Sequence, residues 1–100
     1  DEPVRAWLKA LKPDADRKIV GADILAVQYG WPLGLPLVDN LGGGIWEVRS
    51  KLRNRIARVL FVIEDGAMIL LHGFIKKVQK TPVQELEIAK DRLSKLRGCK

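Results

Sequence analysis

The sequence predicts an α+β fold with two N-terminal helices, an antiparallel sheet of three or four strands and a C-terminal helix. Apolar residues recur at helical spacing over residues 1–30 and again after residue 81, whereas they alternate with polar residues over 45–51. An Asp65-Gly66 pair between two apolar runs indicates a tight hairpin. The chain has 100 residues, 47% of them hydrophobic, which is enough for a single domain over residues 1–100.

Proline separates the first two helices. The first is expected to end near Lys12, because apolar residues recur every third or fourth position before it, at Val4, Trp7, Leu8 and Leu11. The second restarts at Pro13 and is expected to stop at "YGWPLGLP" (29–36), where glycine and proline exclude regular structure. Its apolar positions are Ile19, Val20, Ile24 and Val27.

The middle of the chain reads as strands. "LVDNLGGG" (37–44) predicts a short strand and a turn, and "IWEVRSK" (45–51) predicts a strand with Trp46 and Val48 on one face and Glu47 and Arg49 on the other. From Val59 onward the run "RIARVLFVI" is apolar at every position, as in a central strand whose two faces are both covered. Residues 53–74 are therefore expected to form a β-hairpin.

The last helix is expected to begin with a capping box in which Thr81 is the N-cap, Pro82 is N1 and Gln84 is N3. Its predicted apolar stripe consists of Leu86, Ala89, Leu93 and Leu96. Its predicted outer positions are Glu85, Lys90 and Arg97.

Positive charge is concentrated in the middle of the chain. The net charge is +6, and residues 49–80 carry eight Lys/Arg against two Asp/Glu, compared with five against seven over 1–48 and five against three over 81–100. Such a density is typical of a surface that binds phosphate or another polyanion, although a solvated face that aids solubility is the alternative. The basic residues are Arg49, Lys51, Arg53, Arg55, Arg58, Lys76, Lys77 and Lys80.

Arg58 is the most informative of these residues because it interrupts an apolar strand. A buried guanidinium without a partner is unfavourable, so Arg58 is expected either to face an anion or to pair with Glu47. Arg58 can do both, because a carboxylate that binds an arginine also orients it for a phosphate. With antiparallel pairing, Arg55 or Arg58 would lie opposite Glu47 and Arg49.

Three lysines, Lys76, Lys77 and Lys80, follow the second hairpin strand and precede the last helix. The free amide groups of a helix N-terminus also favour an anion, so strands and connector are expected to line one positively charged groove.

No metal site or cofactor is expected, because the sequence has no HExxH, CxxC, P-loop, GxSxG or dinucleotide motif. His72 shares its strand face with Leu70 and Phe74, which favours a hydrogen-bonded core or sheet-edge histidine over a catalytic one. The single cysteine, Cys99, cannot form an internal disulfide, and no apolar run is long enough for a membrane span. A cytoplasmic protein is therefore expected.

The residues from "GGGIWEVRSK" through "ARVLF" to "LLHGFIKKVQKTP" and the following helix resemble the toxins of RelE/HigB-type toxin–antitoxin pairs, particularly the phage-derived HigB-like branch. The upstream stretches "EPVRAWL" and "QYGWPLGLPLV" fit the same branch. Many members of that superfamily cleave messenger RNA in the ribosomal A site without a metal. Members usually begin with a strand before the first helix, so a leading strand is expected to be missing from this chain.

The resemblance implies an endoribonuclease in which the RNA 2′-hydroxyl attacks the adjacent phosphate. The catalytic residues it implies are Glu47 as base, Arg58 as stabiliser of the phosphorane, and Arg49. The RNA-binding residues it implies are Arg53, Arg55, Lys76, Lys77 and Lys80. Implied partners are messenger RNA, the ribosome and a cognate helix-turn-helix antitoxin in a hetero-oligomer. Two alternatives stay open: a non-enzymatic ParE-like toxin that binds DNA gyrase, and a plain RNA- or ribosome-binding module.

Overall fold

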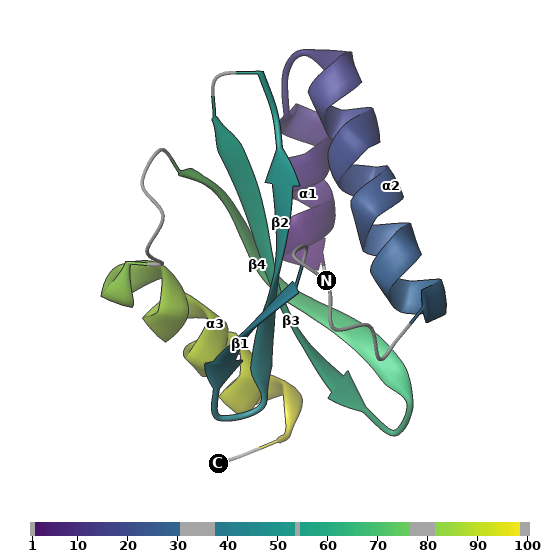
Figure 1. The fold of residues 1–100 in the computed structure, drawn as a ribbon. Coiled ribbons are helices and arrows are strands. Elements are labelled where there is room, and N and C mark those ends of the chain that lie inside the picture. Colours follow the sequence, from purple (N-terminus) through teal and green to yellow (C-terminus); the bar gives the residue numbers. More distant parts are fainter. Residues whose placement is uncertain (1, 31–37, 54, 77–81, 99–100) are drawn as a thin grey trace.

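The computed structural model describes residues 2–30, 38–53, 55–76 and 82–98, with the backbone alone at residues 2 and 76. Within these residues, two helices precede a four-stranded antiparallel sheet of order β1-β2-β3-β4, and a third helix follows it (Figure 1). This confirms the predicted α+β class and element order. The elements are α1 (Glu2–Ala10), α2 (Asp14–Gly30), β1 (Val38–Gly42), β2 (Ile45–Lys51), β3 (Ile56–Glu64), β4 (Ala67–Lys76) and α3 (Val83–Leu96).

Helices cover both faces of the sheet. In Figure 1, α1 and α2 lie together on one side and α3 on the other. The first core contains Val20 and Val27 of α2 against Val59 and Phe61 of β3, and the second contains Leu60 and Val62 of the same strand with residues of α3. Successive side chains of β3 enter different cores. The strand is therefore apolar on both faces from Val59 onward, as the sequence indicated.

The β3–β4 hairpin turns at Asp65 and Gly66, as predicted. Both residues have positive φ, at 52° and 78°, which is the backbone that a two-residue type I′ turn requires. Antiparallel pairing then runs from Glu64↔Ala67 to Ile56↔Lys76. The turn therefore sets the register as far as Phe61↔Leu70, and a shift of one residue follows between Phe61 and Leu60, which pairs with His72.

Two predictions about α3 are wrong. Its N-cap is Pro82, with no side-chain capping bond, so the helix does not begin with Thr81 as N-cap; Thr81 itself lies outside the described residues. Leu96 is 49% exposed and does not belong to the apolar stripe. The hydrophobic cluster under α3 ends at Leu93, and the last turn of the helix continues beyond it.

A glycine in β4 allows α1 to approach the sheet closely. A Cβ atom on Gly73 would lie 2.5 Å from Cε3 of Trp7, which is closer than real Cβ contacts come. The indole ring of Trp7 packs against the α1–α2 core, so it occupies the space that a side chain at position 73 would need. The backbone at Gly73 is thus part of the surface against which α1 packs.

Gly73→Ala is expected to lower the free energy of unfolding by about 1–3 kcal/mol, because the methyl group forces the Trp7 ring to shift. Gly21→Ala in α2 is the matched control, since a Cβ there meets nothing within 4 Å. That change should stabilise the protein by about 0.5–1 kcal/mol through helix propensity. Urea unfolding measures both, and equal effects of the two substitutions would contradict the tight Trp7 contact.

Candidate functional site

A buried ion pair crosses the α3-facing side of the sheet. Nη1 of Arg58 in β3 donates to Oε1 of Glu47 in β2 at 2.9 Å. Glu47 is 0% exposed and Arg58 is 1% exposed. The pairing that the sequence offered as one of two possibilities for Arg58 is therefore present, and it joins the two central strands.

Arg49 lies beside this pair. It is the direct register partner of Arg58, so the two arginine side chains project from the same face. Like charges opposite each other are unfavourable, and the carboxylate of Glu47 relieves this repulsion because Nε of Arg49 stands 3.9 Å from the same Oε1. Two guanidiniums against one carboxylate leave one net positive charge.

The three residues differ in exposure, and this decides what each can do. The Arg49 side chain is 35% exposed, and no hydrogen bond from it is found among the described residues. Its Nε is buried without a hydrogen-bond partner in the part of the chain that the structure describes, so an anion from solvent would meet the exposed part of this side chain, whereas Glu47 and Arg58 are buried. In this structure Glu47 orients arginines, and its role as a base stays a prediction.

Of the other predicted basic residues, Arg55 is shown to bind elsewhere. Arg55 turns toward the α1–α2 junction, where Nη2 donates to Oδ2 of Asp16 at 3.0 Å and to the carbonyl of Lys12. Arg53 is exposed in the bend between β2 and β3. Lys76 ends β4 opposite Ile56, and its side chain, like all of Lys77 and Lys80, lies outside the described part of the chain. Their RNA-binding roles stay predictions.

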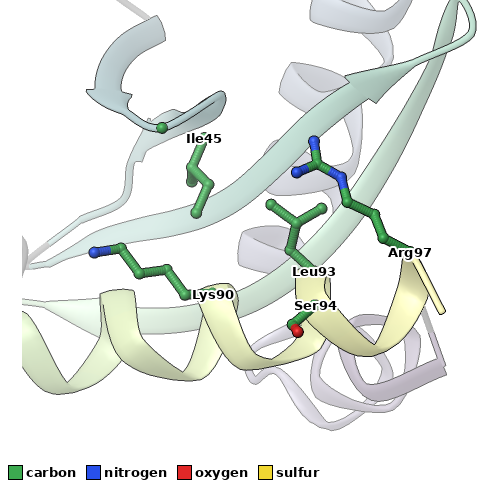
Figure 2. A pocket seen from close by; sticks show the side chains of 6 residues that line it. Ile45, Lys90, Leu93, Ser94 and Arg97 are labelled. Carbon is green, nitrogen blue, oxygen red and sulfur yellow. The ribbon is translucent and has the colours of Figure 1, made fainter. Parts of the chain in front are cut away.

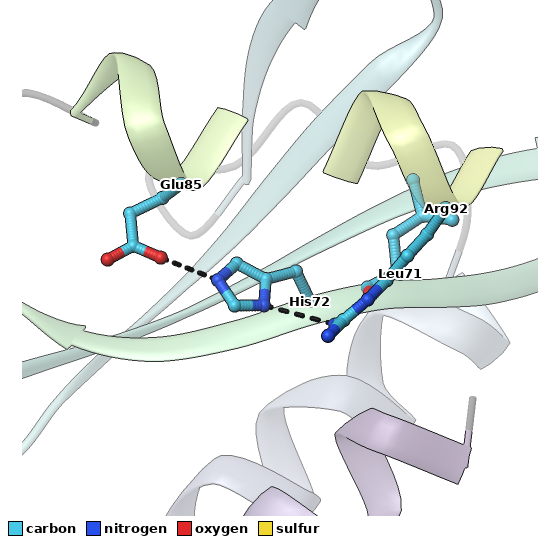
Figure 3. A network of polar contacts seen from close by, with 4 residues as sticks. All are labelled: Leu71, His72, Glu85 and Arg92. Atoms are coloured by element: carbon cyan, nitrogen blue, oxygen red, sulfur yellow. Dashed lines mark hydrogen bonds and ion pairs between the residues drawn. The ribbon is translucent and has the colours of Figure 1, made fainter. Parts of the chain in front are cut away.

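A second polar network lies on the same face, one strand away. His72 is the register partner of Leu60, and its Nε2 lies 2.5 Å from Oε1 of Glu85 in α3 (Figure 3). On the other side of the ring, Nη1 of Arg92 lies 3.2 Å from Nδ1 and donates to the carbonyl of Leu71 at 2.9 Å. The predicted hydrogen-bonded sheet-edge histidine is confirmed.

The partners of His72 assign its tautomer. A guanidinium only donates, so Nδ1 accepts from Arg92, and Nε2 carries the proton and donates a hydrogen bond to Oε1 of Glu85. The ring also stacks on Phe74 at 5.5 Å between centroids, with 24° between the planes. Both nitrogens and one face of the imidazole are therefore used by the protein, which fits a side chain that fastens α3 to β4.

Sequence reasoning missed this network. Glu85 was expected on the outside of α3, and Arg92 was not singled out. Both lie on the flank of the helix that faces β4, which depends on how α3 is rotated over the sheet (Figure 3). The spacing of Glu85 and Arg92, seven residues or two helical turns, was the available signal, because such residues share a helix face.

No group of three or more His, Cys, Asp or Glu side chains that could hold a metal ion is found among the described residues. The same part of the chain has no helix of the length and hydropathy that crossing a membrane requires.

The family model of the phage-derived Gp49-like proteins (DUF891) matches residues 6–94. The chain belongs to this family. Gp49-like proteins are associated with RelE-type, toxin-like proteins. The matched range includes the arginine pair, Glu47 and the His72 network of this Gp49-like chain. No curated protein matches the chain. No solved structure matches it either.

Glu47→Ala is expected to lower the free energy of unfolding by about 3–5 kcal/mol, because it removes the carboxylate from a buried arginine. The double variant Glu47→Leu/Arg58→Met removes both charges and should lose less than the single variant does. Urea unfolding monitored by tryptophan fluorescence compares them. A double variant that is less stable than Glu47→Ala would show that the two charges do not compensate each other.

His72→Phe and Glu85→Gln are expected to be coupled by about 1 kcal/mol in a double-mutant cycle, because their side chains contact each other directly. Phenylalanine keeps the stacking on Phe74 and removes the ring nitrogens, so the cycle reports the polar contact. A control cycle combines His72→Phe with Lys95→Gln, because Lys95 lies on the exposed surface of α3. Coupling that is equal in the two cycles would contradict a specific His72–Glu85 bond.

Proposed function

We propose that this Gp49-like chain is the toxin of a type II toxin–antitoxin pair and that it cleaves messenger RNA on the ribosome. Membership in a toxin-associated family supports the toxin role. The observation that carries the enzymatic role is the arrangement of Arg49 and Arg58 around Glu47 on one sheet face. The protein partner in this proposal is a small helix-turn-helix antitoxin.

The proposed reaction is transfer of a phosphodiester to the neighbouring 2′-oxygen. The 2′-oxygen–phosphorus bond forms, the bond to the 5′-oxygen breaks, and a cyclic phosphate remains. The proton of the 2′-hydroxyl passes to the base, and water gives a proton to the departing 5′-oxygen. Negative charge accumulates on the phosphorane oxygens, so guanidiniums held in place before the reaction lower the barrier.

Two guanidiniums lie near this site: Glu47 accepts a hydrogen bond from Arg58 at 2.9 Å, and its Oε1 lies 3.9 Å from Nε of Arg49. Arg49 is exposed enough to bind the phosphate, and Arg58 supports it from within the sheet. A guanidinium presents a rigid fork of donors that matches phosphate oxygens, whereas a lysine supplies a mobile point charge. In this proposal Glu47 is also the base that accepts the 2′-hydroxyl proton, and this role requires RNA binding to move Arg49 aside, because the carboxylate is 0% exposed in the structure.

Expression of the chain is expected to arrest growth and to create new 5′ ends inside translated messages. Arg49→Ala should reduce the yield of these ends by about 10²-fold or more, because it removes a preorganised phosphate contact. Sequencing of 5′ ends after induction measures this. Lys18→Ala, which removes an exposed cation from α2, should leave the yield unchanged.

Glu47→Gln tests the proposed role of Glu47 as the base. Glutamine retains an oxygen that can accept from Arg58 but cannot take a proton, so it should abolish cleavage while RNA binding persists. If a folded Glu47→Gln variant cleaves RNA at the wild-type rate, Glu47 is not the base and only positions the arginines. Intact messages together with inhibited supercoiling would move the assignment to a gyrase-binding toxin, and salt-sensitive RNA binding without cleavage would move it to an RNA-binding module.

A further inference from the structure

A hollow lies between the β1–β2 turn and the C-terminal half of α3, away from Arg49. Its volume is about 290 Å³, and its lining consists of Gly43, Ile45, Lys90, Leu93, Ser94 and Arg97. Figure 2 shows Ile45 and Leu93 pointing toward each other from strand and helix, with Lys90 and Arg97 on either side. The space is large enough for a leucine- or methionine-sized side chain.

The helical lining residues form a regular row. Lys90 and Ser94 of α3 and its C-cap residue Arg97 stand at i, i+4 and i+7, so the Cα atoms of the two basic residues are about 10 Å apart along the helix axis. The small Ser94 between them lets another backbone come close. The complement of such a row is a second helix with a carboxylate, an apolar side chain and a carboxylate at the same spacing.

The charges at the hollow favour an acidic partner. No ion pair of Lys90 is found within the described residues, where the nearby Asp91 pairs instead with Lys95 at 3.2 Å. Nε and Nη2 of Arg97 bind Oε2 of Glu64 at 2.9 and 2.5 Å, which holds this guanidinium at the edge of the hollow. Lys90 thus supplies the attractive charge, whereas the charge of Arg97 is balanced by Glu64 and its Nη1 is the nitrogen left to donate to a further acceptor.

We infer that this hollow docks an acidic amphipathic helix of a partner protein. One apolar side chain enters between the stems of Lys90 and Arg97 and rests on Ile45 and Leu93. Its two flanking carboxylates, at i and i+7, meet the two cations. The contact uses no residue of the Glu47 group, so the inference holds whether or not the chain cleaves RNA.

The test uses the full chain and a synthetic alanine-based helix of about 16 residues. The peptide carries Glu, Leu and Glu at i, i+4 and i+7, and a matched peptide carries Lys in both Glu positions. In an NMR titration of the isotope-labelled protein, the acidic peptide should shift the amide signals of Gly43, Ile45 and Ser94 saturably. The basic peptide should not.

Lys90→Glu should weaken binding of the acidic peptide at least about fivefold, because it replaces an attractive charge with a repulsive one. Lys90→Met keeps the aliphatic stem and should have a smaller effect. Lys18→Glu on α2 makes the same charge change outside the hollow and should have none. Lys90 is exposed, so both Lys90 variants are expected to fold.

Three results would overturn the inference: equal binding of the two peptides, unchanged affinity of Lys90→Glu, or no saturable shift at millimolar peptide. Shifts confined to α2, where Ile19, Leu25 and Tyr29 are exposed, would also overturn it and place the apolar contact elsewhere. None of these results depends on an RNA-cleavage assay, so failure of the docking site and failure of the proposed activity are separate outcomes.

Discussion

The buried contact between Glu47 and Arg58 governs the organisation of this protein. An arginine in the middle of an apolar strand is tolerated because a carboxylate on the neighbouring strand accepts its hydrogen bond at 2.9 Å. The same carboxylate allows a second arginine, Arg49, to sit directly opposite the first. A concentration of positive charge on one sheet face therefore becomes compatible with a packed interior.

The two polar networks divide the α3 side of the sheet between them. Glu47 and Arg58 join β2 to β3, whereas His72, Glu85 and Arg92 join β4 to α3. Phe74 lies at the border, because it is the register partner of Arg58 and stacks on His72. The side chains that hold α3 are thus separate from those that would meet a phosphate, and only one aromatic ring stands between the two groups.

Much of the fold was predictable because it depends on local patterns. The Asp65-Gly66 turn, the double-sided apolar pattern of β3 and the helical spacing of α1 and α2 each specify their element without knowledge of the rest. The pairing of Glu47 with Arg58 was also foreseeable, since a charged residue in a central strand needs an opposite charge nearby. That argument needed only the order of adjacent strands.

The other contacts depend on how elements dock, which local patterns do not contain. Arg55 was expected near the other basic residues, yet it binds Asp16 because the β2–β3 connection meets the α1–α2 junction. Glu85 was expected to be outside α3, yet the rotation of that helix directs it at His72. Leu96 fits the helical period but is 49% exposed and does not join the cluster under α3.

Side chains of β3 are buried on both faces of the sheet, so an error in the register of this strand would place them in the wrong core. A shift of β3 by one position against β2 would move Arg58 into the apolar layer beneath α1 and α2 and bring Val59 next to Arg49. Such a mispaired hairpin leaves a guanidinium among hydrocarbons and is strongly disfavoured. The ion pair therefore selects the native alignment of β2 with β3 over a slip of one residue when the chain folds.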